Sequence, residues 1–420
     1  MRVRIHRGTQ EIGGSCIELA NDAGERIVLD VGRPLWAGWD EEVATPEVSG
    51  FVDADASLLG VVISHPHLDH YGLLRQVRDD VPVFVGREAA ALLEAASYFS
   101  PISGRIRAAG HLEHRRPFAI GGFRITPFLN DHSAFDAYSL LIEADGRRLF
   151  YTGDIRGHGR KAAMFEELLD EPPSDVDAFL MEGTHIRRDP GHDDADLERE
   201  DELEDRFVEL CASSVGTVAV FGSAQNMDRL VTVYRAAKRS GRQLVIDLYG
   251  ATVAAATRAT IPQPGFDALR VYVPNRQRVL VKQSREFDRV ERIRPHRVFL
   301  EEVAAHPEKF VFHVPSSTAR ELIRGGALTS AGTAVWSLWD GYLRQQWGLA
   351  LASLLAQHEI PMPQVHTSGH ASVKDLRRLV GAIRPSRVVP IHSEAGDRYP
   401  DLFAGVDCHA DGDWWEVKSA

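Results

Sequence analysis

Six short runs of β-branched and aromatic residues in this chain of 420 residues are each followed, within three positions, by a histidine or an acidic residue. The runs are 26–29, 60–63, 123–129, 148–151, 178–181 and 387–391. The residues that follow them are Asp30, the segment 65–70, His132, Asp154, Glu182 and His392. Such runs predict the strands of an α/β fold. Because ligand sites in open α/β sheets form at the carboxyl ends of strands, we expect these side chains to meet in one cleft.

The strongest metal-binding pattern is the segment 64–72, SHPHLDHYG, which follows the run 60–63. It holds four candidate ligands within six residues, namely His65, His67, Asp69 and His70. Imidazoles bind zinc, manganese or iron, and a carboxylate beside them can hold or bridge a second divalent ion. Alternate residues of such a turn can point at different ions. The alternative interpretation is a polar loop with coincidental histidines.

Three further acidic or imidazole side chains are weaker signals when taken singly. A lone histidine after a strand, such as His132, is usually a hydrogen-bonded loop residue, and an aspartate in a Gly-Asp turn, such as Asp154, usually serves the turn. Because the segment 65–70 lies upstream, we interpret both as metal ligands. We interpret Asp30 as a carboxylate that orients a ligand histidine, with a simple turn acid as the alternative.

A second histidine-bearing segment, 366–372, HTSGHAS, precedes a predicted helix at 373–383. Ser372 and Asp375 have the spacing of a capping box at the start of that helix. A loop with hydroxyls and backbone amides beside a helix N-terminus can bind an anion, so we expect a phosphate there. The predicted phosphate contacts are Thr367, Ser368 and His370. The alternative, a helix cap alone, would explain the serine but not the two histidines of the segment.

The candidate ligands stop between about 184 and 365 and resume at 366, which indicates that a second α/β domain is inserted into the first. We predict three sections: 1–183 and 366–420 as one domain, and 184–365 as the insertion. Within the insertion the pattern predicts strands at 217–221, 243–247 and 309–314 and a helix at 224–238.

The net charge of −12 is unevenly distributed. Residues 187–206 contain ten acids and four arginines, and residues 270–297 contain nine basic residues and three acids. We interpret the acidic run as a solvated face. For the basic run a solvated face and a nucleic-acid surface are both open. No apolar run reaches the roughly 18 residues that a membrane span needs. Three scattered cysteines indicate a reducing compartment, so we expect a cytoplasmic protein without membrane contact.

Together these positions resemble the metallo-β-lactamase superfamily and, within it, the β-CASP nucleases, over nearly the whole chain. The motifs are matched by Asp30, His65, His67, Asp69, His70, His132, Asp154, Glu182, His370 and His392. The segment HTSGHA, with a further histidine after a helix and a strand, is similar to ribonuclease J and to the pre-mRNA 3′-end endonucleases. The resemblance implies a metallo-β-lactamase αββα sandwich with an inserted β-CASP α/β domain.

The resemblance also implies roles for individual residues around two zinc ions, with manganese as the alternative metal. One ion would be held by His65, His67 and His132, and the second by Asp69, His70 and His392, with Asp154 bridging them. Asp69 or Asp154 would orient a zinc-activated hydroxide. His370, held by Glu182, would protonate the leaving oxygen as general acid.

The function implied is a ribonuclease that leaves 5′-phosphate and 3′-hydroxyl ends, because a histidine at the position of His392 is associated with RNA-cutting members. Single-stranded RNA is the expected partner. The alternatives are a DNA nuclease, a small-molecule phosphodiesterase or esterase, and an inactive RNA-binding scaffold. The chain ends about 28 residues after His392, and 315–320 departs from the Gly-Ser-Gln-Gly-Glu loop of ribonuclease J. Endonuclease or 5′-exonuclease action, and a homo-oligomer, are therefore left open.

Overall fold

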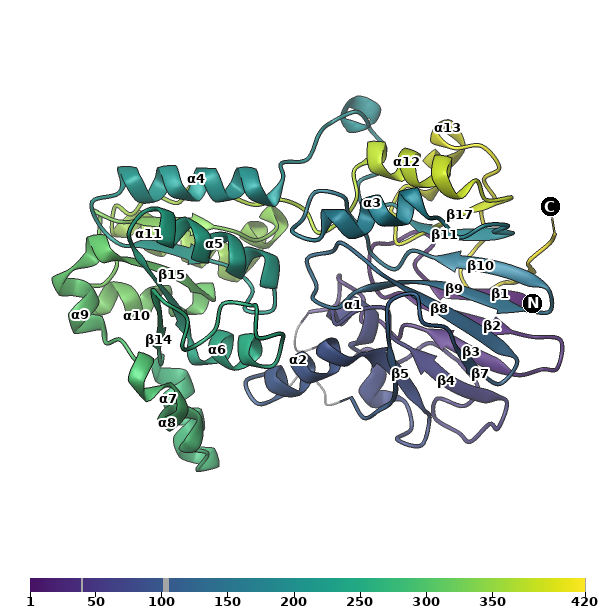
Figure 1. Cartoon of the computed structure of the whole chain (residues 1–420), viewed down its shortest axis with the longest axis horizontal. Helices are drawn as coiled ribbons and strands as arrows, with labels where there is room; N and C mark the ends of the chain where they lie inside the picture. The colour runs from purple at the N-terminus through teal and green to yellow at the C-terminus, as the bar shows by residue number, and fades with distance from the viewer. Residues whose placement is uncertain (39–40, 101–105, 420) are drawn as a thin grey trace. The chain divides into compact units, whose positions relative to one another are not determined.

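The computed structural model (Figure 1) describes residues 1–38, 41–100 and 106–419. The chain folds into two compact units. The first contains Met1–Ser97, Pro101–Leu197 and Gly369–Ala420, and the second contains Tyr98–Ser100 and Glu198–Ser368. Both units combine helices with strands, which confirms the predicted α/β class.

The first unit contains a seven-stranded sheet in the order β18-β1-β2-β3-β4-β5-β6. Its strands are β1 (Arg2–Arg7), β2 (Cys16–Ala20), β3 (Arg26–Leu29), β4 (Leu58–Val62), β5 (Val83–Gly86), β6 (Ala108–Leu112) and β18 (Trp414–Glu416). Strands β3 to β6 run parallel to one another, whereas β18, β1, β2 and β3 pair antiparallel.

The same unit contains a six-stranded sheet in the order β17-β11-β10-β9-β8-β7. Its strands are β7 (Phe118–Ile120), β8 (Phe123–Leu129), β9 (Tyr138–Ala144), β10 (Arg147–Tyr151), β11 (Ala178–Glu182) and β17 (Val388–Ile391). Strands β17, β11 and β10 are parallel, and β10 to β7 form an antiparallel meander. The C-terminal part of the chain therefore adds one edge strand to each of these two sheets.

The two sheets pack face to face around one apolar core. Inward-facing residues such as Ile5 and Ile27 of the first sheet and Ile125 and Leu180 of the second belong to the same buried cluster. A second cluster covers the other face of the six-stranded sheet, where the helices α3 (Ala162–Asp170), α12 (Val373–Ile383) and α13 (Tyr399–Leu402) pack. The helices α1 (Leu68–Tyr71) and α2 (Arg87–Ser97) follow β4 and β5 of the first sheet. Apolar faces on both sides of each sheet produce the predicted sandwich.

The second unit contains a five-stranded, fully parallel sheet in the order β14-β13-β15-β12-β16. Its strands are β12 (Val218–Phe221), β13 (Gln243–Asp247), β14 (Leu269–Tyr272), β15 (Phe310–Val314) and β16 (Thr333–Trp336). Its helices are α4 (Glu200–Ser213), α5 (Met227–Arg239), α6 (Leu248–Ala255), α7 (Asn275–Ser284), α8 (Asp288–Ile293), α9 (Leu300–Ala305), α10 (Ala319–Arg324) and α11 (Gln346–Gln357). The strands are buried on both faces, as is typical of parallel sheets.

The predicted elements are confirmed to within a few residues. Strands β3 and β8 and helix α12 have the predicted bounds, and Ser372 accepts a hydrogen bond from the backbone N–H of Asp375, 3.1 Å away, as the predicted cap. Helix α5 begins at Met227 rather than at 224, because Asn226 caps it through the N–H of Arg229.

The acidic run 187–206 is only partly a solvated face, which corrects the prediction. Glu200 is 1% exposed and pairs with the buried Arg229, with 3.1 Å between Oε1 and Nη2. The part before Leu197 packs in the first unit, where Asp193 lies 2.9 Å from the Arg398 guanidinium. The main segment of the second compact unit begins at Glu198, whereas the sequence pattern predicted a boundary at 184. The predicted domain limits remain predictions.

The basic run 270–297 includes the exposed helices α7 and α8 of the second unit. Among the described residues, no helix combines the length and the hydropathy that a membrane span requires.

Candidate metal centre

Strand ends of the first unit bring the predicted ligands together, although they are far apart in the sequence. Asp30 follows β3, His132 follows β8, Asp154 follows β10 and His392 follows β17. The segment that carries His65, His67, Asp69 and His70 leads from β4 into α1. All the candidate metal ligands lie in this one unit.

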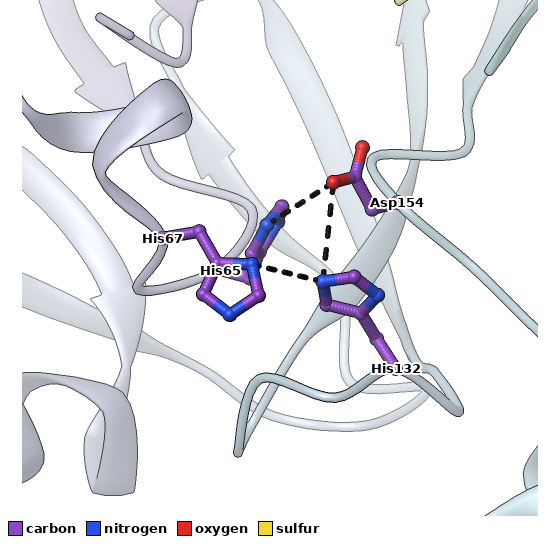
Figure 2. A group of neighbouring side chains, drawn as sticks. All are labelled: His65, His67, His132 and Asp154. Atoms are coloured by element: carbon purple, nitrogen blue, oxygen red, sulfur yellow. Dashed lines mark hydrogen bonds and ion pairs between the residues drawn. The ribbon is translucent and has the colours of Figure 1, made fainter. Parts of the chain in front are cut away.

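The first ligand group consists of His65, His67, His132 and Asp154, whose ligand atoms lie within 4.8 Å of one another. Figure 2 shows the four side chains converging on a common point. The Asp154 Oδ2 atom is 3.5 Å from His65 Nε2 and 3.9 Å from His132 Nε2. The His132 Nε2 and His67 Nδ1 atoms are 3.1 Å apart. Three imidazoles and one carboxylate are a ligand set that suits zinc.

The second ligand group consists of Asp69, His70, His392 and the same Asp154. The His70 Nε2 atom is 3.2 Å from Asp154 Oδ2 and 3.9 Å from Asp69 Oδ2. The His392 Nε2 atom is 3.8 Å from Asp69 Oδ2, and His392 Nδ1 is 3.7 Å from Asp154 Oδ1. Because Asp154 belongs to both groups, its carboxylate can bridge two ions.

A third cluster joins Asp154 to Glu182 and His370. The His370 Nδ1 atom is 3.0 Å from Glu182 Oε2 and 3.7 Å from Asp154 Oδ2. The Glu182 carboxylate also accepts hydrogen bonds from the backbone N–H groups of Ile155 and Thr184. Its oxygens are therefore already engaged, so we interpret this cluster as a carboxylate that holds an imidazole.

Buried polar atoms of the two ligand groups lack hydrogen-bond partners among the described residues. They are His65 Nε2, His70 Nε2, His392 Nε2 and both carboxylate oxygens of Asp154. Leaving a buried polar atom unsatisfied costs about 1–3 kcal/mol, so five such atoms around one point call for a ligand. Cations at this point would satisfy all of them. The residues therefore fit a pair of divalent ions.

Asp30 and Ser64 orient the imidazoles of His65 and His70 through hydrogen bonds to their Nδ1 atoms. Asp30 Oδ2 accepts hydrogen bonds from His70 Nδ1 at 2.8 Å, from the Tyr151 hydroxyl at 2.8 Å and from the Ser64 hydroxyl at 2.7 Å. The Ser64 hydroxyl thus donates to Asp30 and accepts from His65 Nδ1 at 3.0 Å. With their Nδ1 atoms protonated, His65 and His70 direct Nε2 lone pairs at the centre. Asp30 has a φ of +59°, which an aspartate tolerates better than most residues.

His132 and His392 are held by backbone groups and, for His392, also by a serine hydroxyl. His132 Nδ1 donates to the carbonyl of Gly369, and a Cβ at Gly369 would lie 2.6 Å from the Ser133 hydroxyl oxygen. A side chain at position 369 would therefore require the Ser133 hydroxyl to move. The backbone N–H of His392 donates to the carbonyl of Gly8 at 2.6 Å, and Ser15 Oγ lies 3.2 Å from His392 Nδ1.

Sequence reasoning did not identify Ser64, Tyr151 or the loop 8–15 as parts of this centre. Ser64 and Tyr151 each adjoin a predicted ligand segment, but nothing in their spacing indicated that both bind Asp30. The glycine-rich loop 8–15, GTQEIGGS, was an available signal for close backbone packing.

Burial and neighbouring charges shift the pKa values in opposite directions. Burial holds the pKa values of His65 and His132 well below the ordinary value and lowers that of His67 to about 4, so these imidazoles are neutral. Burial also acts on His370, but Glu182 and Asp154 outweigh it and raise the His370 pKa to about 9. At neutral pH His370 is therefore protonated and can donate a proton.

The predicted phosphate contacts are divided between the units. His370 belongs to the first unit, whereas Thr367 and Ser368 belong to the second. Their joint contact with a phosphate remains a prediction.

Two family models match the chain. A beta-lactamase superfamily domain matches residues 37–204, and a Zn-dependent metallo-hydrolase RNA specificity domain matches residues 362–398. The first range includes His65, His132 and Asp154, and the second includes His370 and His392. The first ligand group therefore lies wholly within the first matched range, whereas the second group also takes His392 from the second range.

Similar proteins include ribonuclease J of Mycobacterium tuberculosis, which is 25% identical over 93% of this chain and 68% of its own length. Ribonuclease J of Mycolicibacterium smegmatis is 24% identical with the same coverage of both chains. An RNase J-like protein of Methanocaldococcus jannaschii is 26% identical over 44% of this chain and 42% of its own. A crystal structure of a protein of unknown function from Enterococcus faecalis has the same fold, with a TM-score of 0.75, 20% identity and 99% coverage of both chains.

Proposed function

We propose that this chain, a metal-dependent hydrolase of the metallo-β-lactamase superfamily, hydrolyses RNA phosphodiester bonds at a centre that holds two zinc ions. The observation that carries the proposal is the sharing of Asp154 between two complete ligand groups. A buried carboxylate that faces five imidazoles is stabilised by cations and would otherwise be costly to bury.

The first ion would be held by His65, His67 and His132, the second by Asp69, His70 and His392, and Asp154 would contact both. Manganese is the alternative metal for the same ligands. Two divalent ions at this place would lower the pKa of a water molecule and neutralise charge on a phosphate.

Asp69 and Asp154 are the two candidates for orienting the attacking water. Asp69 is 13% exposed at its side chain and Asp154 only 1%. Because a water molecule must enter from the solvent, the exposure favours Asp69. Its carboxylate would accept a hydrogen bond from the water and align it with the phosphorus.

His370 would protonate the leaving 3′ oxygen, which yields a 3′-hydroxyl and a 5′-phosphate. Its pKa of about 9 keeps the proton available at neutral pH, and Glu182 holds the ring at 3.0 Å. General acid catalysis of this kind contributes about 10²- to 10⁴-fold.

Four observations support RNA as the substrate. They are the RNA specificity domain match, the ribonuclease J relatives, the histidine at position 392 and the basic run 270–297. Basic side chains on α7 and α8 offer phosphate contacts, which would make RNA affinity fall with salt.

The test combines metal quantification with product mapping. The full-length protein would be analysed for bound zinc and manganese and incubated with labelled single-stranded RNA that carries a 5′-phosphate, a 5′-triphosphate or a 5′-hydroxyl. The expected result is two ions per chain and fragments with 5′-phosphate and 3′-hydroxyl ends. The dependence on the 5′ group separates endonuclease from 5′-exonuclease action.

Parallel substrates test the alternatives. Faster cleavage of matched single-stranded DNA would indicate a DNA nuclease, and turnover of bis-p-nitrophenyl phosphate without RNA cleavage would indicate a small-molecule phosphodiesterase. A protein that binds RNA but holds no ion and cuts nothing would be a scaffold. Each of these results contradicts the proposed function.

A further inference from the structure

Beside the candidate metal centre, the segment 33–38 exposes two large apolar side chains. Leu35 is 53% exposed and Trp36 is 65% exposed. We propose that Trp36, with Leu35 beside it, is a stacking platform for a nucleobase of the substrate strand next to the scissile phosphate. This inference rests on the proposed nuclease function and adds to it a residue that belongs to neither ligand group.

The Trp36 ring is exposed but held in place. Its Nε1 donates a hydrogen bond to Glu11 Oε2 at 3.0 Å. The other oxygen of that carboxylate, Oε1, lies 3.6 Å from Arg7 Nε. One edge of the indole is thus anchored, and most of the ring surface remains open to solvent. A ring that is already oriented loses little conformational freedom when a partner stacks on it.

Leu35 adjoins the carboxylate of a candidate metal ligand. A Cβ placed on Gly13 would lie 2.8 Å from Leu35 Cγ and 3.1 Å from Asp69 Oδ2. Both side chains therefore lie close to the position that a side chain of Gly13 would occupy. This contact places the platform at the rim of the second ligand group.

Backbone hydrogen bonds fix the platform to the segment that carries the ligands. The N–H of Arg33 donates to the carbonyl of Leu68 at 2.9 Å, and the N–H of Ser15 donates to the carbonyl of Asp69 at 3.1 Å. Gly13 and Pro34 form an isolated antiparallel bridge. The distance from Trp36 to the metal centre is thereby set by the fold.

A nucleobase is the occupant that fits this surface. Every base offers a flat π face, and stacking on an aromatic side chain contributes affinity whatever the base is. Two side chains are too small for a stable protein partner, which buries about 800 Å² on each side. The charged residues Arg7 and Glu11 beside the ring also distinguish this surface from a membrane anchor.

The experiment compares Trp36→Ala, Trp36→Phe and the control Trp414→Ala in the zinc-loaded full chain. Trp414 lies on β18 of the same unit and is 38% exposed. The substrates are a short single-stranded RNA, the same RNA with abasic residues flanking the mapped cleavage site, and bis-p-nitrophenyl phosphate, which has no base.

Trp36→Ala is expected to raise the KM for RNA by about 10- to 100-fold and to leave turnover of bis-p-nitrophenyl phosphate unchanged. Trp36→Phe should recover most of the loss, because it keeps an aromatic ring. For the wild type, the KM for the abasic RNA should exceed the KM for the intact RNA by a similar factor. For Trp36→Ala, the two KM values should be equal. The control should behave as the wild type on every substrate.

Three results would overturn the platform: an unchanged KM for RNA in Trp36→Ala, an equal loss on bis-p-nitrophenyl phosphate, or an equal loss in the control. If Trp36→Ala does not fold, the wild type is compared on the intact and the abasic RNA. An equal KM for the two RNAs contradicts stacking. A wild type that binds RNA without cutting it contradicts the proposed function but not the platform. Quenching of tryptophan fluorescence by RNA, lost in Trp36→Phe, then decides the platform.

Discussion

The two ligand groups share Asp154 but differ in what supports their imidazoles. In the first group, His65 and His132 donate from Nδ1 to neutral oxygens, the Ser64 hydroxyl and the Gly369 carbonyl. In the second group, His70 donates to the buried carboxylate of Asp30. The second group also contains Asp69 in place of a third imidazole.

This difference gives the two groups different charge. An imidazole supported by a carboxylate is a stronger ligand than one supported by a neutral oxygen, because the carboxylate stabilises positive charge on the ring. The second group combines such a ring with the Asp69 carboxylate. We therefore expect the second group to depend on buried negative charge and the first on the packing of neutral rings.

The largest effect is expected from Asp154→Asn, which removes the carboxylate that the two ligand groups share. Loss of one partner from a buried charged cluster costs about 3–5 kcal/mol, which corresponds to about 10²- to 10⁴-fold in ion affinity. Metal analysis after dialysis should show both ions reduced, and RNA cleavage should be lost. Loss of only one ion would show that Asp154 does not bridge.

The next largest effect is expected from His370→Ala, because His370 belongs to neither ligand group but is the proposed general acid. It should leave the ion content at the wild-type value and reduce the turnover of RNA by about 10²- to 10⁴-fold. Single-turnover cleavage and metal analysis on the same preparation measure the two quantities. Normal cleavage by this variant would exclude His370 as the acid.

A smaller and selective effect is expected from Asp30→Asn. The substitution removes the negative charge that supports His70. The affinity for the ion of the second ligand group should fall by about 10- to 100-fold, and the affinity for the other ion should stay unchanged. Stepwise chelator titration measures the two affinities. Asp136→Asn is a matched control, because this buried carboxylate binds the Ala89 N–H and the Tyr138 hydroxyl rather than a ligand ring. An equal loss of affinity for both ions in Asp30→Asn would contradict the proposed difference between the two ligand groups.

The smallest effect is expected from Tyr151→Phe, which removes one of the hydrogen bonds to Asp30 but leaves its charge. A buried hydrogen bond contributes about 1 kcal/mol, so the same ion should weaken by about fivefold. In the same titration, Asp30→Asn should therefore lose more ion affinity than Tyr151→Phe. The reverse order would show that Asp30 acts through its hydrogen-bonding shape rather than through charge.

Local patterns made much of the fold and the ligand segments predictable. The strand at 123–129 and the helix at 373–383 have clear periodicity and a recognisable cap, and both lie where they were expected. The segment 65–70 carries its own chemical signal because four ligands are adjacent in the sequence. Such features depend only on neighbouring residues.

Contacts between distant segments could not be predicted in the same way. The burial of Glu200 depends on Arg229 from another helix, and the packing of Asp193 depends on Arg398, some two hundred positions away. A charge run looks the same in sequence whether it faces water or an opposite charge. The contact of Ser15 with His392 likewise joins the two ends of the chain.

The pairing of β17 with β11 has a consequence for biosynthesis. His392 reaches the centre only after Val388–Ile391 has joined the parallel edge of the six-stranded sheet. The second ligand group can therefore be completed only after the residues up to His392 have left the ribosome, whereas all the ligands of the first group lie within residues 65–154.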